Sequence, residues 1–527
     1  MSGLMSRRDA LVMGSAGIAL ATWASPVFAA VSDTSVDAIV RQFMTRFEIP
    51  GIGIAIIRPG QPPLTRGYGV RKLGQRGNVD ADTLFAIASN SKSFVAAGLA
   101  LLVDEGRITW DQPVINLMPD FAMSDPNATR MMTVRDLLVH RSGLALGAGD
   151  LMQFPLSDHK RAQYLPALKH LKFARGFRTG YAYDNILYVI AGMLIERLTG
   201  QSWEAFTTAR LLRPLGMQTA FANREMLSTS NIVGRHARLG PPSRGLGALR
   251  LVEPDEALAS APAGGIHAST RDIARWLEVQ LGRGRTSGGR RLWTEARSND
   301  MWTPHIITKA STGPLAASPS DAVMTGYALG WFVQDYRGRR LVHHSGGLSG
   351  QMTQTALLPE QGIGLAVFSN TEDRLPVFAL RSALLDHLLG APAYNWDAWA
   401  RTSMDKEAAE VRKLIGNGDF AAPPGGPSLP LDRYAGRYRD PWYGDIVVAR
   451  RGNGLAIDFT HTPVFKSALE PFGPDAFRTR FAQGAGEDAV VTFILANGQV
   501  TGMRMKALSP IADFSYDFHD LEPVRVR

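Results

Sequence analysis

The stretch "AAPPGGPSLP" at residues 421–430 divides the chain into two parts of different character. Repeated proline and glycine favour neither helix nor strand, so a segment of this composition is typical of a linker. Helical and strand-like segments are mixed before it, whereas the pattern after residue 431 is almost entirely β. Since 527 residues are enough for at least two domains, we predict a folded unit on each side of the linker.

The part after the linker is predicted to be a small antiparallel β domain, residues 431–527. Two of its segments, "GDIVVARRGNGLAIDF" and "VVTFILANGQVTGMRMKAL", place Asn-Gly between β-rich runs. Asn-Gly between such runs is the strongest short-range signal for a hairpin. We therefore expect a barrel-like β domain, preceded by a helix near residues 404–415 and the linker within residues 396–430.

The part before the linker predicts an α/β fold in which helices flank an antiparallel sheet. Apolar residues at helical spacing predict helices from Ser89 to Asp104 and from Ile186 to Leu198, each followed by a glycine. Six short β-rich runs separated by turns predict an antiparallel sheet. These runs are "GIGIAIIRPG" and "LTRGYGV" near the N-terminus, and "YALGWFVQDY", "RRLVHHS", "QTALLPE" and "IGLAVFSN" further on.

The first 29 residues resemble a twin-arginine export signal. Arg7 and Arg8 precede an apolar stretch that ends in small residues at Ala29. The apolar stretch is shorter than the roughly 20 residues that span a bilayer, so we favour a cleaved signal over the alternative, a retained membrane anchor. We expect the mature chain to have no integral membrane span and to be periplasmic or secreted.

Composition excludes several classes of chemistry. The chain has no cysteine, which excludes disulfides and thiolate nucleophiles. Its 57 Lys+Arg and 48 Asp+Glu leave a net charge of +9 without a long basic run, which indicates a cationic surface and no nucleic-acid partner. No H-E-x-x-H or other paired His/Glu spacing suggests a metal, and no G-x-S-x-G suggests an α/β-hydrolase. We expect no cofactor.

A serine followed three residues later by lysine occurs at Ser89/Lys92, Ser157/Lys160 and Ser403/Lys406. Only Ser89 begins a largely apolar helix, where Lys92 lies one turn further along the same face. Such surroundings disfavour an ammonium, so Lys92 would be a neutral amine able to take the serine proton. Ser157 lies in a loop, and a helix cap is a sufficient explanation for Ser403.

The segment "FAIASNSKSF" around Ser89 resembles the active-serine motif of the serine β-lactamase and penicillin-binding-protein superfamily. The similarity is greatest to the branch of class C β-lactamases, D-aminopeptidases and esterases. That branch has Y-x-N and then K-T-G or H-x-G, and here Tyr183-Asp184-Asn185 and His344-Ser345-Gly346 follow in the same order. The stretches "LLVHRSGL" and "YALGWF" also look like this family. The resemblance covers about residues 36 to 390, within a catalytic domain at 30–395, and the tail is similar to an appended lipocalin-like domain.

The resemblance implies roles for the motif residues. Tyr183 would serve as a proton shuttle whose phenolate a nearby ammonium stabilises, and Asn185 would bind Lys92 and the substrate. The structural alternatives are a core tyrosine and a helix-capping asparagine. The backbone N–H of Gly347, after Ser345 and Gly346, would form an oxyanion hole with that of Ser89.

The third motif begins with His344 instead of lysine, as in the D-aminopeptidase and esterase members. Lysine there helps to hold a substrate carboxylate, so strict carboxylate recognition is not expected. Because an ordinary imidazole titrates near pH 6.5, we expect His344 to change charge in the working range. Adjacent strand residues point to opposite faces, so His343 faces away from the cleft.

These observations predict an exported serine hydrolase that forms an acyl-enzyme on Ser89. Its substrate would be a small-molecule or peptide ester or amide, as for an esterase or D-amino-acid peptidase. The alternatives are a true β-lactamase or D-Ala-D-Ala carboxypeptidase, or a penicillin-acylated sensor that does not turn over. A catalytically silent scaffold requires a broken motif, and none of the three motifs is broken. The sequence carries no signal for an oligomeric state.

Overall fold

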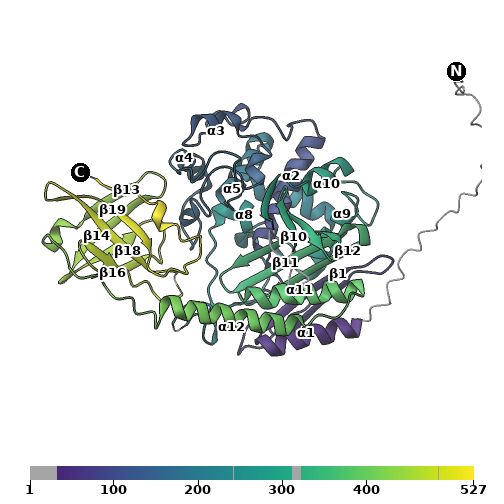
Figure 1. Cartoon of the computed structure of the whole chain (residues 1–527). Coiled ribbons are helices and arrows are strands. Elements are labelled where there is room, and N and C mark those ends of the chain that lie inside the picture. The colour runs from purple at the N-terminus through teal and green to yellow at the C-terminus, as the bar shows by residue number, and fades with distance from the viewer. Residues whose placement is uncertain (1–32, 241, 311–321, 485, 527) are drawn as a thin grey trace, which may run out of the picture.

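A computed structural model of the protein describes residues 33–240, 242–310, 322–484 and 486–526. The expected export signal at residues 1–29 lies outside these residues. The described chain is elongated, with a larger α/β unit and a barrel at one end; the helix α12 (Trp396–Ile415) lies along the larger unit and ends toward the barrel (Figure 1). No helix in the described ranges is both long and apolar enough to span a bilayer.

The larger unit is built on an antiparallel sheet with strand order β2-β1-β12-β11-β10-β9-β8-β7. It has eight strands where the sequence shows six β-rich runs, because β7 and most of β8 lie outside those runs. The run "YALGWFVQDY" contains the turn between β8 and β9. Gly330 in that turn has a φ of +76°, a conformation that favours glycine. The strands are β1 (Gly51–Ile57), β2 (Leu64–Gly69), β7 (Ile306–Ala310), β8 (Met324–Tyr327), β9 (Phe332–Tyr336), β10 (Arg339–Leu348), β11 (Gln351–Leu358) and β12 (Ile363–Ser369).

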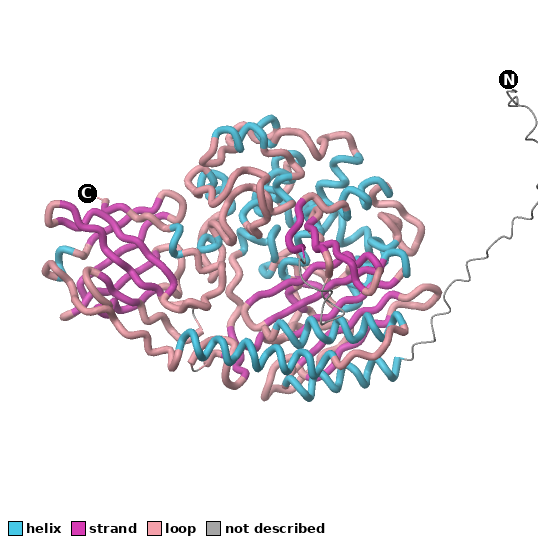
Figure 2. Tube along the Cα trace, in the orientation of Figure 1, coloured by secondary structure: helices cyan, strands magenta, loops and turns pink. Residues whose placement is uncertain are grey.

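Helices cover both faces of this sheet, which confirms the predicted α/β class (Figures 1 and 2). The central strand β12 is buried along its whole length, as its apolar sequence requires for a strand covered on two sides. One face is covered by α11 (Arg374–Leu389), on which α1 (Asp33–Phe47) and α12 pack. The other carries α2 (Ser91–Asp104), α5 (Ile186–Thr199), α8 (Ala261–Gly264), α9 (Thr270–Leu281) and α10 (Glu295–Trp302).

The helix α2 forms the centre of the larger unit. It begins two residues later than predicted, because residues Ala88–Asn90 form a short 3-10 turn. Every residue from Ser91 to Leu102 is buried. A Cβ added at Gly98 would lie 3.2 Å from side-chain atoms of both Ile195 and Phe206, so α2 packs closely on α5 at this position.

Shorter elements complete the larger unit. Two small antiparallel pairs connect distant parts of the chain: β3 (Phe85–Ala86) with β6 (His267–Ala268), and β4 (Arg235–Arg238) with β5 (Leu249–Val252). The pairing of β3 with β6 holds the segment that precedes the Ser89 turn. The short helices are α3 (Pro126–Met131), α4 (Tyr164–Leu168), α6 (Trp203–Thr207) and α7 (Arg213–Leu215).

The C-terminal unit is a closed antiparallel barrel, as predicted. Both predicted hairpins are present: Asn497-Gly498 forms the second turn, whereas the first turn is Gly452-Asn453, one residue earlier than expected. The domain boundaries at residues 395 and 430 stay a prediction. The strands are β13 (Gly436–Asp440), β14 (Gly444–Arg451), β15 (Gly454–Phe459), β16 (Lys466–Pro471), β17 (Ala476–Arg478), β18 (Ala489–Ala496), β19 (Gln499–Ala507) and β20 (Val524–Arg525).

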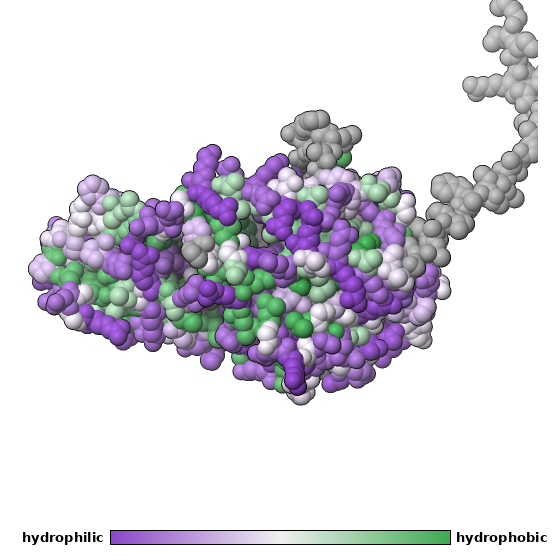
Figure 3. All heavy atoms as spheres, turned by 90° about the horizontal axis from the view of Figure 1, so that it is seen from below, coloured by the Kyte–Doolittle hydropathy of each residue, from purple (hydrophilic) through white to green (hydrophobic). Residues whose placement is uncertain are grey.

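The surface is mainly hydrophilic on the side along which α12 runs. Figure 3 shows this face covered largely by polar side chains, with hydrophobic ones gathered toward its middle. The helix α12 is 20 residues long and begins at Trp396, with the Asn395 side chain accepting a hydrogen bond from the Ala398 N–H. It therefore extends well beyond the predicted residues 404–415.

Candidate active site

Ser89 lies in the 3-10 turn between β3 and α2. The preceding residue, Ala88, has a φ of +49°, a left-handed conformation that costs a non-glycine residue about 1–3 kcal/mol. The Ile87 N–H donates to the Ile266 carbonyl at 2.8 Å and holds this turn against β6. The strained turn leaves the half-buried Ser89 side chain facing the cleft described below.

Lys92 lies one helical turn after Ser89 and is fully buried. Its Nζ is 3.1 Å from Ser89 Oγ, 2.7 Å from Asn185 Oδ1 and 2.8 Å from the Ala263 carbonyl oxygen. Burial lowers the pKa of Lys92 to about 7, although the charges of Asp150 and Asp184 act to raise it. A substantial neutral fraction is therefore present at neutral pH.

The neutral form of Lys92 has one arrangement that satisfies its neighbours. A neutral amine has two N–H donors and one lone pair. The Asn185 and Ala263 oxygens can only accept, so they take the two N–H groups. The lone pair then faces the Ser89 hydroxyl, which donates to it. The arrangement is that of a nucleophile with its general base.

Tyr183 lies beside this pair. Its ring centroid is 4.9 Å from Lys92 Nζ, and its hydroxyl is hydrogen-bonded to the Ser89 side chain. Burial, together with the charges of Asp150 and Asp184, raises the pKa of Tyr183 despite that hydrogen bond. The expectation of a stabilised phenolate is therefore wrong: Tyr183 carries a neutral hydroxyl, which can both donate and accept a hydrogen bond.

Asn185 precedes α5, but its side chain caps no backbone N–H of that helix. Its Oδ1 accepts from Lys92, and its Nδ2 donates to both carboxylate oxygens of Asp150, at 3.2 and 3.0 Å. Asn185 is therefore not the helix-capping residue that the sequence offered as an alternative. Asn185 connects Lys92 to a carboxylate that the sequence analysis did not identify.

His344 is buried on β10, with both ring nitrogens occupied. Its Nε2 lies 3.0 Å from the Tyr327 hydroxyl and its Nδ1 2.6 Å from the Ser345 carbonyl oxygen. Burial and then the Lys92 charge lower the pKa of His344 to about 3. The expectation that His344 titrates near neutral pH is therefore wrong. His343 faces the other side of the sheet, where it contacts Gln334 and Arg381.

Gly346 and Gly347 follow on the same strand. A Cβ at Gly346 would lie 2.3 Å from the Ile87 carbonyl oxygen and 2.9 Å from the Ala88 Cβ, so only glycine lets β10 approach the nucleophile turn. Ser345 and Gly347 line the cleft together with Ser89. Six of the eight predicted site residues thus line one cleft, and the other two, Lys92 and Gly346, lie beside Ser89 and its turn.

The other two serine–lysine pairs lack this setting. The Ser157 hydroxyl donates to the Met152 carbonyl oxygen, and Lys160 is exposed. Ser403 lies in the interior of α12 and not at its start, and Lys406 is exposed. Neither lysine is buried beside its serine as Lys92 is beside Ser89.

Two site residues were missed from the sequence. His140, in the quoted stretch "LLVHRSGL", has a φ of +54° and its Nδ1 accepts the Asp184 N–H at 3.1 Å. The fully buried Asp150 accepts hydrogen bonds beneath Asn185. His140 lies in a stretch that already resembled the family, whereas a single aspartate between glycine and leucine carries no signal.

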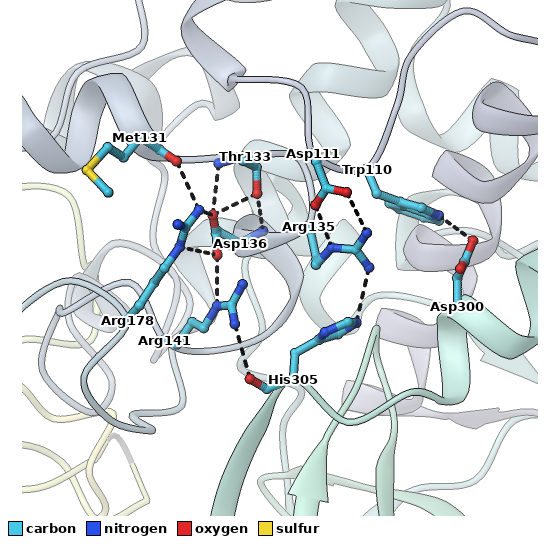
Figure 4. Close-up of polar contacts among 10 residues, drawn as sticks. All are labelled: Trp110, Asp111, Met131, Thr133, Arg135, Asp136, Arg141, Arg178, Asp300 and His305. Carbon is cyan, nitrogen blue, oxygen red and sulfur yellow. Dashed lines mark hydrogen bonds and ion pairs between the residues drawn. The ribbon is translucent and has the colours of Figure 1, made fainter.

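The segment that carries His140 is anchored by the buried carboxylate of Asp136 (Figure 4). Arg141 Nε donates to Asp136 at 2.8 Å and Arg178 Nε at 3.1 Å, while Thr133 adds its N–H and hydroxyl. Burial acts to raise the pKa of Asp136, but these donors hold it below its usual value. Arg141 also donates to the His305 carbonyl oxygen, which ties the segment to the start of β7.

A cleft of about 920 Å³ opens above Ser89. Aromatic side chains lie in its lining near the nucleophile, and charged side chains from both units also line it. Within the described residues, no group of three or more His, Cys, Asp or Glu is suited to hold a metal ion. The aromatic residues are Tyr181, Tyr183, Phe332 and Phe514, and the charged ones include Arg244, Glu256, Glu372, Glu487 and Asp513.

Fold and site together are those of a serine hydrolase, and known proteins are similar to this chain in sequence and in fold. Residues 36–389 match the Beta-lactamase family, and residues 421–525 match a domain of unknown function (DUF3471). The chain is 29% identical over 428 residues to the unguisins hydrolase ungD' of Aspergillus campestris, covering 78% of this chain and 76% of that protein. It is 26% identical over 498 residues to the unguisins hydrolase ungD of Aspergillus violaceofuscus, covering 89% and 85%.

Solved structures have the same fold. The D-amino acid amidase from Ochrobactrum anthropi aligns with a TM-score of 0.54 at 23% identity, over 68% of this chain and 98% of that one. The octameric penicillin-binding protein homologue from Pyrococcus abyssi aligns with a TM-score of 0.56 at 20% identity, over 94% and 100%. The chain belongs to the Beta-lactamase family and is a serine hydrolase.

Proposed function

We propose that the protein hydrolyses an ester or amide through an acyl-enzyme on Ser89. Ser89 Oγ attacks the substrate carbonyl carbon while Lys92 takes the hydroxyl proton. The proton passes to the leaving group, directly or through the Tyr183 hydroxyl, as the bond to that group breaks. Water then attacks the acyl carbon, the bond from that carbon to Ser89 Oγ breaks, and a proton from the water passes to Ser89 Oγ as the acid product leaves. The observation that carries this proposal is the set of three Lys92 contacts, which leaves its lone pair for Ser89.

The backbone N–H groups of Ser89 and Gly347 form the proposed oxyanion hole. Both residues line the cleft, and the close approach of Gly346 to Ile87 and Ala88 keeps β10 beside the nucleophile turn. Donors held in this way stabilise charge that develops on the carbonyl oxygen, and each is typically worth about 3 kcal/mol of the barrier.

The proposed substrate is a small molecule or peptide that needs no free carboxylate next to the scissile bond. His344 occupies the place where a lysine would hold such a carboxylate, and its low pKa keeps it neutral. The aromatic lining near Ser89 favours an apolar or aromatic group on the substrate. A relative named as a hydrolase and a structural neighbour named as a D-amino acid amidase support amide hydrolysis among these options.

A hydrolysis panel on purified protein tests the proposal. It contains a p-nitrophenyl ester, a D-aminoacyl anilide, a D-Ala-D-Ala peptide and nitrocefin, each measured as kcat/KM. Intact mass spectrometry after rapid quenching detects the acyl group on Ser89. We expect turnover of the ester or the anilide, well above turnover of the D-Ala-D-Ala peptide. A stable adduct with nitrocefin and no turnover of any substrate would instead identify a sensor and overturn the proposal.

A further inference from the structure

The C-terminal unit reaches the catalytic residues through two side chains that follow its strand β19. Ser515 Oγ donates to Asp150 Oδ2 at 2.9 Å. The Asp517 carboxyl group accepts the N–H of Gly149 at 2.7 Å and of Leu151 at 3.0 Å. All of these groups are buried. The Ser515 side chain therefore holds the Asp150 carboxylate, and the Asp517 side chain holds the backbone on either side of Asp150.

Asp150 in turn determines how the Asn185 amide is oriented. Three side chains donate to Asp150: Asn185 to both oxygens, Gln153 to Oδ1 at 2.5 Å and Ser515 to Oδ2. An ionised carboxylate only accepts hydrogen bonds, so the amide nitrogen of Asn185 must face it. The amide oxygen is then the atom that faces Lys92.

This orientation matters for the general base. With the oxygen toward Lys92, Asn185 takes one N–H of the amine and leaves the lone pair for Ser89. The reversed amide would point its NH₂ group at Lys92 and donate to that lone pair. The amine would then be unable to accept the Ser89 proton.

We propose that Asp150 and Ser515 are positioning residues that fix the Asn185 amide, so that the C-terminal barrel unit supplies part of the catalytic arrangement. The inference rests on the proposed function, because it concerns the base that activates Ser89. Neither residue contacts Ser89 in the described structure, and both act through Asn185. The barrel unit is then a component of the enzyme and not a separate appendage.

The groups around Asp150 determine its pKa and therefore how the reactivity of Ser89 depends on pH. Burial raises the pKa of Asp150 to about 7, while the Ser515, Asn185 and Gln153 hydrogen bonds and the Lys92 charge act to lower it. The active form requires Asp150 ionised and Lys92 neutral. The titratable groups whose charge interacts with that of Asp150 are Lys92 from α2, Tyr164 from α4, Tyr183 before α5 and Asp517 from the C-terminal unit. Asp184 acts on the same Lys92.

Two variants are expected to shift the acid limb of the pH profile in opposite directions. Ser515→Ala removes a donor that lowers the pKa of Asp150, so the limb moves to higher pH, by about half a unit or more. Asp150→Asn removes a negative charge that raises the pKa of Lys92, so the limb moves to lower pH. A loss of packing alone would lower the rate in both variants without moving either limb.

The measurement is the rate at which a fluorophosphonate probe labels Ser89 in the full-length protein, between pH 5 and 9. We expect the rate at the plateau to fall about 10-fold in Ser515→Ala and about 100-fold in Asp150→Asn. Ser157→Ala, which removes a buried serine that donates to the Met152 carbonyl oxygen, is the matched control and should leave rate and limb unchanged. Melting temperatures identify any variant that is not folded.

The outcomes separate the two levels of the proposal. If the probe does not label Ser89 in the natural protein, the proposed function itself is wrong. If the natural protein is labelled and both variants have the same plateau rate and acid limb as the natural protein, Asp150 and Ser515 have no positioning role. Equal downward or equal upward shifts in the two folded variants would also overturn the inference, since the argument requires opposite signs.

Discussion

The imidazole of His140 lies against the phenol ring of Tyr183, with the two ring centroids 4.1 Å apart. Burial lowers the pKa of His140, so the ring that packs against Tyr183 is neutral. The same imidazole accepts the Asp184 N–H and thereby holds the turn that leads into α5. The position of the proposed proton shuttle is thus determined by the segment that Asp136 anchors.

Replacing Ser89 by alanine should abolish hydrolysis and fluorophosphonate labelling. The expected loss in kcat is on the order of 10⁴-fold or more, because nucleophile and base act as a unit. Ser157→Ala and Ser403→Ala serve as controls and should keep full activity, since their lysine partners are exposed. Unchanged turnover in folded Ser89→Ala would contradict the mechanism.

Activity should rise with pH through about 7. Lys92 acts as a base only when neutral, and burial lowers its pKa to about 7. Because Asp150, whose pKa burial raises to about 7, must also be ionised, kcat/KM should fall by up to about 100-fold per pH unit well below that value. Since the pKa of Tyr183 is raised, its ionisation should cause no loss of activity up to pH 9. The check is a kcat/KM profile for a neutral ester, and an acid limb near pH 4 would show that a carboxylate is the base.

His344→Lys should shift preference toward substrates that bear a free carboxylate. The natural imidazole is neutral at all working pH values, whereas a lysine there would become charged as pH falls. Hydrogen bonds to charged groups contribute about 1.5–3 kcal/mol, so the preference for a carboxylate-bearing ester over a neutral one should rise about 10-fold or more. If the ratio of the two kcat/KM values is the same in both proteins, the substrate does not reach position 344.

Gly346→Ala should impair catalysis more than folding. Its Cβ would meet the Ile87 carbonyl oxygen at 2.3 Å, so β10 and the nucleophile turn must move apart. A misplacement near 1 Å can cost about 100-fold in rate. Gly454→Ala on β15 is the control, because only the Arg451 carbonyl oxygen lies within reach, at 3.9 Å. Wild-type kcat/KM in Gly346→Ala would mean that the approach of the two segments is unimportant.

We propose export of the folded protein by the twin-arginine route. Replacing Arg7 and Arg8 by lysine should leave the precursor in the cytoplasm, because the pair is the recognised part of such signals. Cell fractionation and the apparent mass of the protein measure this directly. A variant that is still processed outside the cytoplasm would indicate ordinary secretion.

The sequence predicted the parts of the site that depend on local pattern. Ser89 and Lys92 were found because a helix brings positions three apart together, and Tyr183, Asn185 and His344 because motifs carry them. Asp150 was missed because its importance comes from what surrounds it in space. The pKa direction of Tyr183 and the charge of His344 were mispredicted for a similar reason, since burial determines both and a sequence motif does not show burial.

The sheet illustrates the same limit. A continuous β-rich run such as "YALGWFVQDY" does not show that the chain reverses at Gly330, so β8 was not recognised as a strand of its own. The linker predicted a separate C-terminal unit, but nothing in its composition indicated that Ser515 and Asp517 would contact residues 149–151. Contacts between distant segments depend on shape and not on local composition.

The contact between Ser515 and Asp150 joins residues that are 365 positions apart in the chain. At about 5–20 residues per second, a ribosome makes Ser515 roughly 20 to 70 s after Asp150. The nucleophile and its lysine are thus synthesised and begin to fold long before the hydroxyl that steadies the carboxylate beneath them exists. During that interval Asp150 lacks its contact with Ser515, so the proposed role of Ser515 predicts that full hydrolytic activity appears only after the C-terminal unit has been made.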